Sequence, residues 1–318
     1  MLLWLIIAGS VGLLGVGVCL WWWVPKLQMR SVTAADPKAR ADIEDNFRKT
    51  VGQALGGVFV LVGAGLAYYG TLQTLQGNED QARRSQREAH DLLISNQVSK
   101  GFEQFGSDNV RVRLGGIYAL EGVMNTSEQY HQPVLEALSA FVRDGTRDAT
   151  GDGPPVADVQ AALTVIGRRA TIGTGWPDLT NAHIPKANLI EADLSGAGLD
   201  GADLNGAYLA KANMAGAFLD HANLTGADLL SANLRDAVLK HANLSSASPV
   251  GADLNDADLR GANLTGGDLR SANLTDAWLD DANLTGTDLR GAKITQAHLD
   301  QACGTDAKLD PSLTLKPC

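Results

Sequence analysis

The chain has 318 residues, which is enough for two domains and a membrane anchor, and its formal net charge is −10. Residues 177–310 contain 19 acidic and nine basic side chains, so this segment alone has a net charge of −10. Nucleic-acid-binding proteins normally carry the opposite charge, which argues against that class. The three cysteines, Cys19, Cys303 and Cys318, show neither metal-site spacing nor a disulfide framework, and they leave the redox compartment open.

Residues 1–24 are predicted to form a first transmembrane helix. The run has no charged residue and ends in Trp21, Trp22 and Trp23. About 20 apolar residues span a bilayer, and tryptophan is enriched at the water–lipid boundary. The alternative is a cleaved signal peptide. It is disfavoured because no basic residue precedes the run and no small-x-small cleavage site comes after it.

Residues 51–75 are predicted to form a second transmembrane helix, after a loop at 25–50. This run is rich in glycine, which is common in membrane helices because it lets two helices approach closely. We therefore expect a helical hairpin and an integral membrane protein, in the simplest case of a bacterial inner membrane. The loop holds six Lys and Arg residues and three arginines follow the second helix. The positive-inside rule then places the loop in the cytoplasm and both chain ends outside. The predicted side of the membrane for the repeat domain depends only on this difference between six and three basic residues.

Three helical regions are predicted between the membrane segments and the C-terminal half. Residues 76–98 are polar, contain no proline, and indicate an exposed linker helix. Residues 99–146 have apolar side chains at spacings of three and four on two consecutive segments, which predicts a helical hairpin domain. Residues 147–176 begin as a linker rich in Gly, Pro and Asp and continue as a helix that is expected to cap the C-terminal half.

Residues 177–310 repeat with a period of five. Leucine, isoleucine or methionine stands at every fifth position from Leu179 to Leu299, with Pro249 as the exception. Alanine precedes most of these positions by two residues, and Asn or Asp commonly lies between. Side chains alternate between the two sides of an extended segment, so leucine and alanine are predicted to point inward and the intervening residue outward.

This segment resembles the pentapeptide-repeat family, whose motif is Ala-Asp/Asn-Leu-x-x. The resemblance implies a right-handed quadrilateral β-helix in which four repeats form one coil, and hence about six coils here. The chain as a whole is then an α+β protein with two transmembrane helices, a small helical domain and this β-helix. Pro249 cannot donate a ladder hydrogen bond, which predicts a local bulge. Gly304 in place of leucine indicates that the stack is ending, and residues 311–318 form a short tail.

No feature of the sequence indicates catalysis, and we expect no enzyme, no cofactor and no metal. His221 and His241 are 20 residues apart and are expected to stack on neighbouring coils, but no third type of metal ligand recurs beside them. Aspartates are plentiful, yet a convex rod offers no cleft to desolvate them, and strongly shifted pKa values usually require burial.

The predicted function is that of a membrane-anchored scaffold for protein–protein interaction, with an unidentified protein and the lipid bilayer as partners. No nucleic-acid partner is expected, and the oligomeric state is not predicted. Two alternatives stay open. The resemblance admits a DNA mimic that modulates a topoisomerase, although the repeat segment has only about half of the roughly 18 charges that duplex DNA of similar length carries. The second alternative is a membrane effector in which binding to the rod rearranges the hairpin.

The candidate partner-binding residues lie on one face of the predicted rod, because residues 20 apart share a column. Large apolar groups in an outward column often mark an interface, and tryptophan is enriched among residues that dominate binding. The column reads Gly198, Phe218, Val238, Asp258, Trp278 and His298, and the residues of the charged rim are Asp220, Lys240, Arg260 and Asp280. The competing interpretation is that the helical domain covers these side chains or that they lie singly in solvent. A second apolar column, suited to packing against the helices, reads Ile190, Ala210, Leu230 and Val250.

Overall fold

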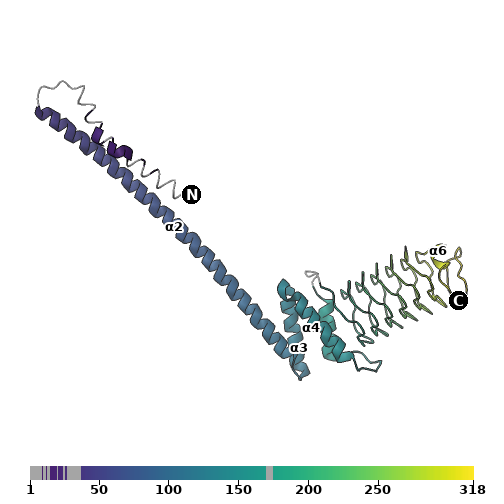
Figure 1. Ribbon diagram of the computed structural model, residues 1–318. Helices are drawn as coiled ribbons and strands as arrows, with labels where there is room; N and C mark the ends of the chain where they lie inside the picture. Colours follow the sequence, from purple (N-terminus) through teal and green to yellow (C-terminus); the bar gives the residue numbers. More distant parts are fainter. Residues whose placement is uncertain are drawn as a thin grey trace. The chain divides into compact units, whose positions relative to one another are not determined.

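A computed structural model describes residues 9, 12, 15–19, 21–23, 26, 37–169 and 175–318 (Figure 1). The chain forms two compact units, Met1–His90 and Asp91–Cys318. Most of the predicted first transmembrane helix, 1–24, lies outside the described residues, as does 27–36 of the predicted loop. The described residues 15–19 and 21–23 are helical.

Helix α2, Pro37–Phe105, has 69 residues and contains both the predicted second transmembrane helix and the predicted linker helix. The predicted loop is therefore wrong from residue 37 onward. Pro37 suits the first position of a helix, and ion pairs one turn apart, Arg48–Glu44 at 2.5 Å and Lys49–Asp45 at 2.8 Å, support the polar turns before the apolar run. Within the described part of the chain, α2 is the one helix whose length and composition suffice to cross a membrane.

In the first unit, the helical residues 15–19 and 21–23 lie along α2. Trp21 Nε1 donates a hydrogen bond to the carbonyl oxygen of Arg48 at 3.3 Å, and a Cβ atom on Gly17 would lie 2.5 Å from Leu55 Cδ2. Trp21 contacts Arg48, and Gly17, earlier in the chain, lies beside Leu55, later in the chain. The N-terminal helical segment and α2 therefore run in opposite directions. Glycine at position 17 permits this close approach.

In the second unit, three helices pack against one another: α3 (Val110–Thr126), α4 (Glu128–Thr146) and α5 (Ala157–Gly167). The end of α2 joins them through Phe105, whose ring centre lies 5.0 Å from that of Phe141 in α4. Asn109 caps α3 by accepting a hydrogen bond from the backbone N–H of Arg111 at 3.0 Å. The side chains at the centre of this group are completely buried, and include Ile117, Leu138 and Ile166. The predicted hairpin is thus part of a larger helical group to which the helix after the linker also belongs.

The repeat segment is a stack of coils of 20 residues each. Parallel bridges join residues 20 apart, as in the series Asp203, Asn223, Asn243, Asn263 and Asn283. Each pentapeptide contributes one bridge residue followed by a turn, so one coil has four turns. The described residues of this segment form isolated bridges rather than extended strands. Four turns per coil agree with the quadrilateral β-helix that pentapeptide repeats imply.

The inward and outward assignment of the repeat is confirmed. The leucines and the alanines two residues before them are buried along the stack, for example Leu234 at 0% and Ala232 at 1% exposure. From Leu179 to Leu289, the second residue after each inward position has a positive φ, such as 58° at His221 and 64° at Gly226. Glycine adopts this conformation without strain, which explains its frequency at that position.

The bulge predicted at Pro249 is wrong. The sequence of bridge and turn continues through residues 246–251 without an added residue. Ser246 N and Gly251 N still donate to Thr265 O and Arg270 O, both at 2.9 Å. Proline removes only the ladder bond that its own N–H would have made, and its fixed φ suits the position otherwise.

The helices close the first coil on all four sides. Arg143 bonds to Asp178, and Thr146 Oγ1 accepts from the N–H of His183 at 3.2 Å. The remaining two sides are closed by Gln160, whose amide pairs with both backbone groups of Asn188, and by Gly167 O, which accepts from Asp193 N at 2.8 Å. An open stack would expose unpaired backbone groups, so these contacts prevent edge-to-edge association.

The C-terminal end departs from the sequence expectation in two respects. Helix α6, Gln296–Leu299, replaces one side of the last coil, because Thr295 and His298 form a capping box. A disulfide joins Cys303 to Cys318, with the Cα atoms 4.7 Å apart. The spacing of the cysteines did not indicate this pair, because only the return of the tail across the last coil brings the two residues together.

Candidate protein-interaction face

The residues of the predicted apolar column follow one another on the stack, with the charged Asp258 between Val238 and Trp278. Parallel bridges connect Gly198, Phe218, Val238, Asp258 and Trp278 in order, and we call these five residues the aromatic column. Phe218 is 48% and Trp278 54% exposed, whereas Val238 is half-buried. His298, predicted as the next member, lies in α6 instead. The helices of the same unit leave the two aromatic side chains open to solvent.

Ion pairs hold the charged rim against the aromatic column. Arg260 donates two hydrogen bonds to Asp258, from Nε to Oδ1 at 2.8 Å and from Nη2 to Oδ2 at 2.7 Å. Lys240 Nζ lies 3.3 Å from Asp258 Oδ2. The side-chain hydrogen bonds from Arg260 lower the pKa of Asp258 below its ordinary value, against the opposing effect of burial. The carboxylate therefore stays charged and fixes both cations.

Arg260 also supports the exposed tryptophan. Its guanidinium carbon lies 4.7 Å from the centre of the Trp278 ring, within the range of a cation–π contact. The indole is thus oriented before any partner arrives, although more than half of its surface is open. Asp220 and Asp280 lie in the same column as Lys240 and Arg260, one coil to either side of them. Asp220 Oδ1 is buried and has no hydrogen-bond partner.

The second apolar column adjoins the helices only at Ile190, which lines a pocket with Leu163 and Thr164 of α5, and the expectation is not met further along the column. Ile190 is 51% and Leu230 45% exposed, while Ala210 and Val250 are half-buried. The helix α5 reaches this side through the bonds between Gln160 and Asn188 and leaves Leu230 exposed. Tyr208, exposed by 50%, lies on the same side of the stack. The sequence pattern did not single out Tyr208, because the other residues of its own column, such as Asn188 and Asp228, are polar.

The histidines stack as predicted, with ring centres 5.1 Å apart and an angle of 16° between the planes of His221 and His241. No group of three or more metal-binding side chains occurs among the residues that the structure describes. The pair is accordingly a stacking contact between neighbouring coils.

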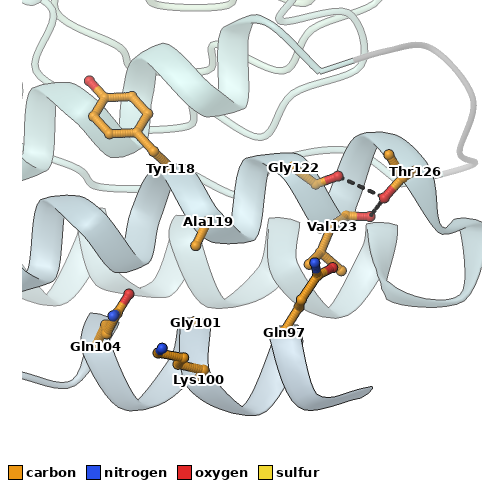
Figure 2. A pocket seen from close by; sticks show the side chains of 9 residues that line it. All are labelled: Gln97, Lys100, Gly101, Gln104, Tyr118, Ala119, Gly122, Val123 and Thr126. Carbon is orange, nitrogen blue, oxygen red and sulfur yellow. Dashed lines mark hydrogen bonds between the residues drawn. The ribbon is translucent and has the colours of Figure 1, made fainter. Parts of the chain in front are cut away.

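A groove of about 570 Å³ lies between the end of α2 and α3 in the second unit. Figure 2 shows Ala119 and Val123 of α3 directed toward α2, with Gln97, Lys100 and Gln104 on the facing helix. The hydrogen bonds drawn there join Thr126 Oγ1 to the carbonyl oxygens of Gly122 and Val123, within α3. The sequence did not predict this groove, and we assign no ligand to it.

The geometry defines a solenoid repeat protein, whose functional surface is the outside of a stack of coils. The chain belongs to the pentapeptide-repeat family. The family "Pentapeptide repeats" matches in eight copies over residues 178–209, 202–240, 232–270 and 268–303. Proteins of this class are generally structural or interaction proteins rather than enzymes. Among curated proteins nothing matches the chain.

Several solved pentapeptide-repeat proteins resemble this chain. Rfr23 from the cyanobacterium Cyanothece is 33% identical over 32% of this chain and 63% of its own, so the chain spans less than two thirds of that relative, with a TM-score of 0.26. HetL from Nostoc, involved in heterocyst differentiation regulation, is 34% identical over 42% of this chain and 70% of its own, with a TM-score of 0.26. A pentapeptide-repeat protein from the Arabidopsis thaliana thylakoid lumen is 31% identical over 34% of this chain and 78% of its own, with a TM-score of 0.27.

Proposed function

We propose that this protein is a membrane-anchored scaffold that binds a protein partner through the aromatic column and its charged rim. The observation that carries the proposal is Trp278, which is exposed yet held over Arg260 at 4.7 Å. An aromatic side chain that is already ordered loses little conformational freedom on binding, so more of its burial contributes to affinity. The partner that fits this face offers an apolar patch bordered by charges of both signs.

The acidic character of the repeat does not favour the DNA-mimic alternative. On this face, the carboxylate of Asp258 is neutralised by two cations, Lys240 and Arg260. Elsewhere Asp268 and Asp288 pair with Arg270 and Arg290 at 2.7 and 2.6 Å. A mimic of duplex DNA needs a dense row of unpaired negative charges instead.

We expect the double variant Phe218→Asp and Trp278→Asp to lose partner binding. Truncating a central tryptophan commonly costs about 2 kcal/mol or more, which is at least about 30-fold in affinity. The measurement is capture of protein partners from detergent-solubilised membranes by the full chain. The matched control is Tyr208→Asp with Leu230→Asp, which places the same charges on exposed apolar positions of another side. Full retention of partners by the first variant would place the binding face elsewhere.

Membrane anchoring is supported by the first unit. Lys26 Nζ lies 4.7 Å from the centre of the Trp22 ring, and the guanidinium of Arg48 lies 5.9 Å from that of Trp21. Tryptophan with neighbouring cations is typical of the membrane–water boundary. In a hairpin of two spans, boundary residues at this end support a loop on one side of the bilayer and a repeat domain on the other.

We therefore propose the orientation that has the loop in the cytoplasm and the repeat domain in the opposite, oxidising compartment. The positive-inside rule supports the first half, and the Cys303–Cys318 disulfide supports the second, since disulfides are rare in the cytosol. In a Cys19→Ser background, we expect a cysteine at Asp42 to react with a membrane-impermeant maleimide only after cell lysis. A cysteine at exposed Thr275 should react in intact cells or spheroplasts. The reverse pattern would invert the orientation, and release of the protein by alkaline carbonate would contradict anchoring itself.

A further inference from the structure

The tail completes the last coil in place of a further repeat. Gly304 occupies a leucine position, and its N–H donates to the carbonyl oxygen of Lys316 at 2.8 Å. A Cβ atom on Gly304 would lie 3.0 Å from Leu315 Cδ2 and 2.7 Å from the carbonyl carbon of Leu284. The leucine of the tail therefore covers the core where the repeat's own leucine is missing.

Leu313 of the tail is half-buried against the core as well, whereas the polar contacts of the tail are exposed. The Gln296 amide donates to Thr314 O and accepts from Thr314 N, both at 2.9 Å, and Lys316 Nζ donates to Asp300 O at 2.8 Å. Exposed hydrogen bonds contribute little net stability, because water offers similar partners when they open. The covalent bond between Cys303 and Cys318, which are 15 residues apart in sequence, holds these apolar and polar contacts together.

That bond is accessible to a reagent in solution. Cys303 is half-buried and Cys318 is exposed, and the only other cysteine of the chain, Cys19, belongs to the first unit. A thiolate can therefore attack Cys318 Sγ without prior unfolding of the coils. The core of the stack, in contrast, contains no cysteine.

We propose that Cys303 and Cys318 form a thiol–disulfide modification site that opens and closes the C-terminal cap. In closing, the two thiols lose two protons and two electrons, and the disulfide of a thiol–disulfide oxidoreductase accepts them and becomes a dithiol. In opening, a dithiol of the same enzyme class returns them and the Sγ–Sγ bond breaks. The reduced form frees residues 311–318 and exposes the backbone edge of the last coil, including Gly304 N–H. This site is independent of the aromatic column.

The test is amide hydrogen exchange on the full chain in lipid nanodiscs, in a Cys19→Ser background, with and without a dithiol reductant. Loss of a disulfide that closes a loop of about 15 residues should speed exchange at Gly304 and at residues 314–316 by on the order of 100-fold. The amide of Leu234, in the middle of the stack, should not change. Cys318→Ser should show the same fast exchange without reductant, and Cys303→Ser together with Cys318→Ser should add nothing further.

Slow exchange at Gly304 in Cys318→Ser would overturn the proposal, because closure would then not need the bond. Two thiols that still react with an alkylating reagent after the membranes have been treated with a disulfide oxidant would also overturn it. Since Cys318 is exposed and lies outside the coils, its substitution leaves the fold available for the measurement even if Cys303→Ser does not fold.

Discussion

Leu234→Arg is expected to unfold the repeat segment. Leu234 is completely buried, and its neighbours at the same position of adjacent coils, Met214 and Leu254, are buried as well. An arginine there places a charge in an apolar interior without a partner, which costs several kcal/mol. Each coil contacts only the coils beside it, so loss of one removes the support of both neighbours. We expect a broad loss of the β signal in far-ultraviolet circular dichroism and a fall in Tm of more than about 10 °C.

The matched control is Thr275→Arg. Thr275 is exposed and shares its column with the native Arg235, so the same side chain enters the same side of the stack but points into solvent. Its effect should stay within about 0.5 kcal/mol. Similar unfolding in both variants would mean that the inward and outward positions of the repeat have been assigned wrongly.

The repeat was predictable from sequence because its register is set by one strict local rule. Every leucine position from Leu179 to Leu289 is buried wherever it holds leucine, isoleucine or methionine, and the alanines two residues earlier obey the same rule. The columns result from the same periodicity. A step of 20 leads from Trp278 back to Asp258, and Arg260 follows Asp258 by two residues, so the neighbourhood of Trp278 could be located by counting. The pairing of Arg260 with Asp258 repeats at Arg270 and Arg290, each two residues after an aspartate.

The two ends of the stack were not predictable in this way, because each depends on contacts between segments of unrelated pattern. The Cys303–Cys318 bond needs the tail to turn back, and nothing in a period of five encodes that return. Gln160 shows no signal in sequence, yet it pairs with both backbone groups of Asn188. The start of α2 at Pro37 was missed because hydropathy marks the apolar part of a helix and not its polar extension.

Breaking the ion pair that joins α3 to α5 is expected to loosen the helical group. Arg113 donates from Nε and Nη2 to Asp158 Oδ2 at 2.7 and 2.6 Å, and the two side chains are only 19% and 7% exposed. Arg113→Met leaves the carboxylate buried with the backbone N–H of Val159 as its remaining donor, at 3.0 Å. Breaking a buried pair from one side costs about 3–5 kcal/mol, and partial exposure of Arg113 places the expected loss near the lower end.

The double variant Arg113→Met with Asp158→Leu should recover most of that loss, because replacing both charges by apolar groups is often close to neutral. The measurement is amide hydrogen exchange in α5 and at Asp193, whose N–H donates to Gly167 O across the junction with the first coil. Faster exchange at both places in Arg113→Met, with recovery in the double variant, is the expected pattern. If Arg113→Met leaves exchange at Asp193 unchanged, α5 closes the first coil without help from this ion pair, and the helical group and the stack are held together by Arg143, Thr146 and Gln160 instead.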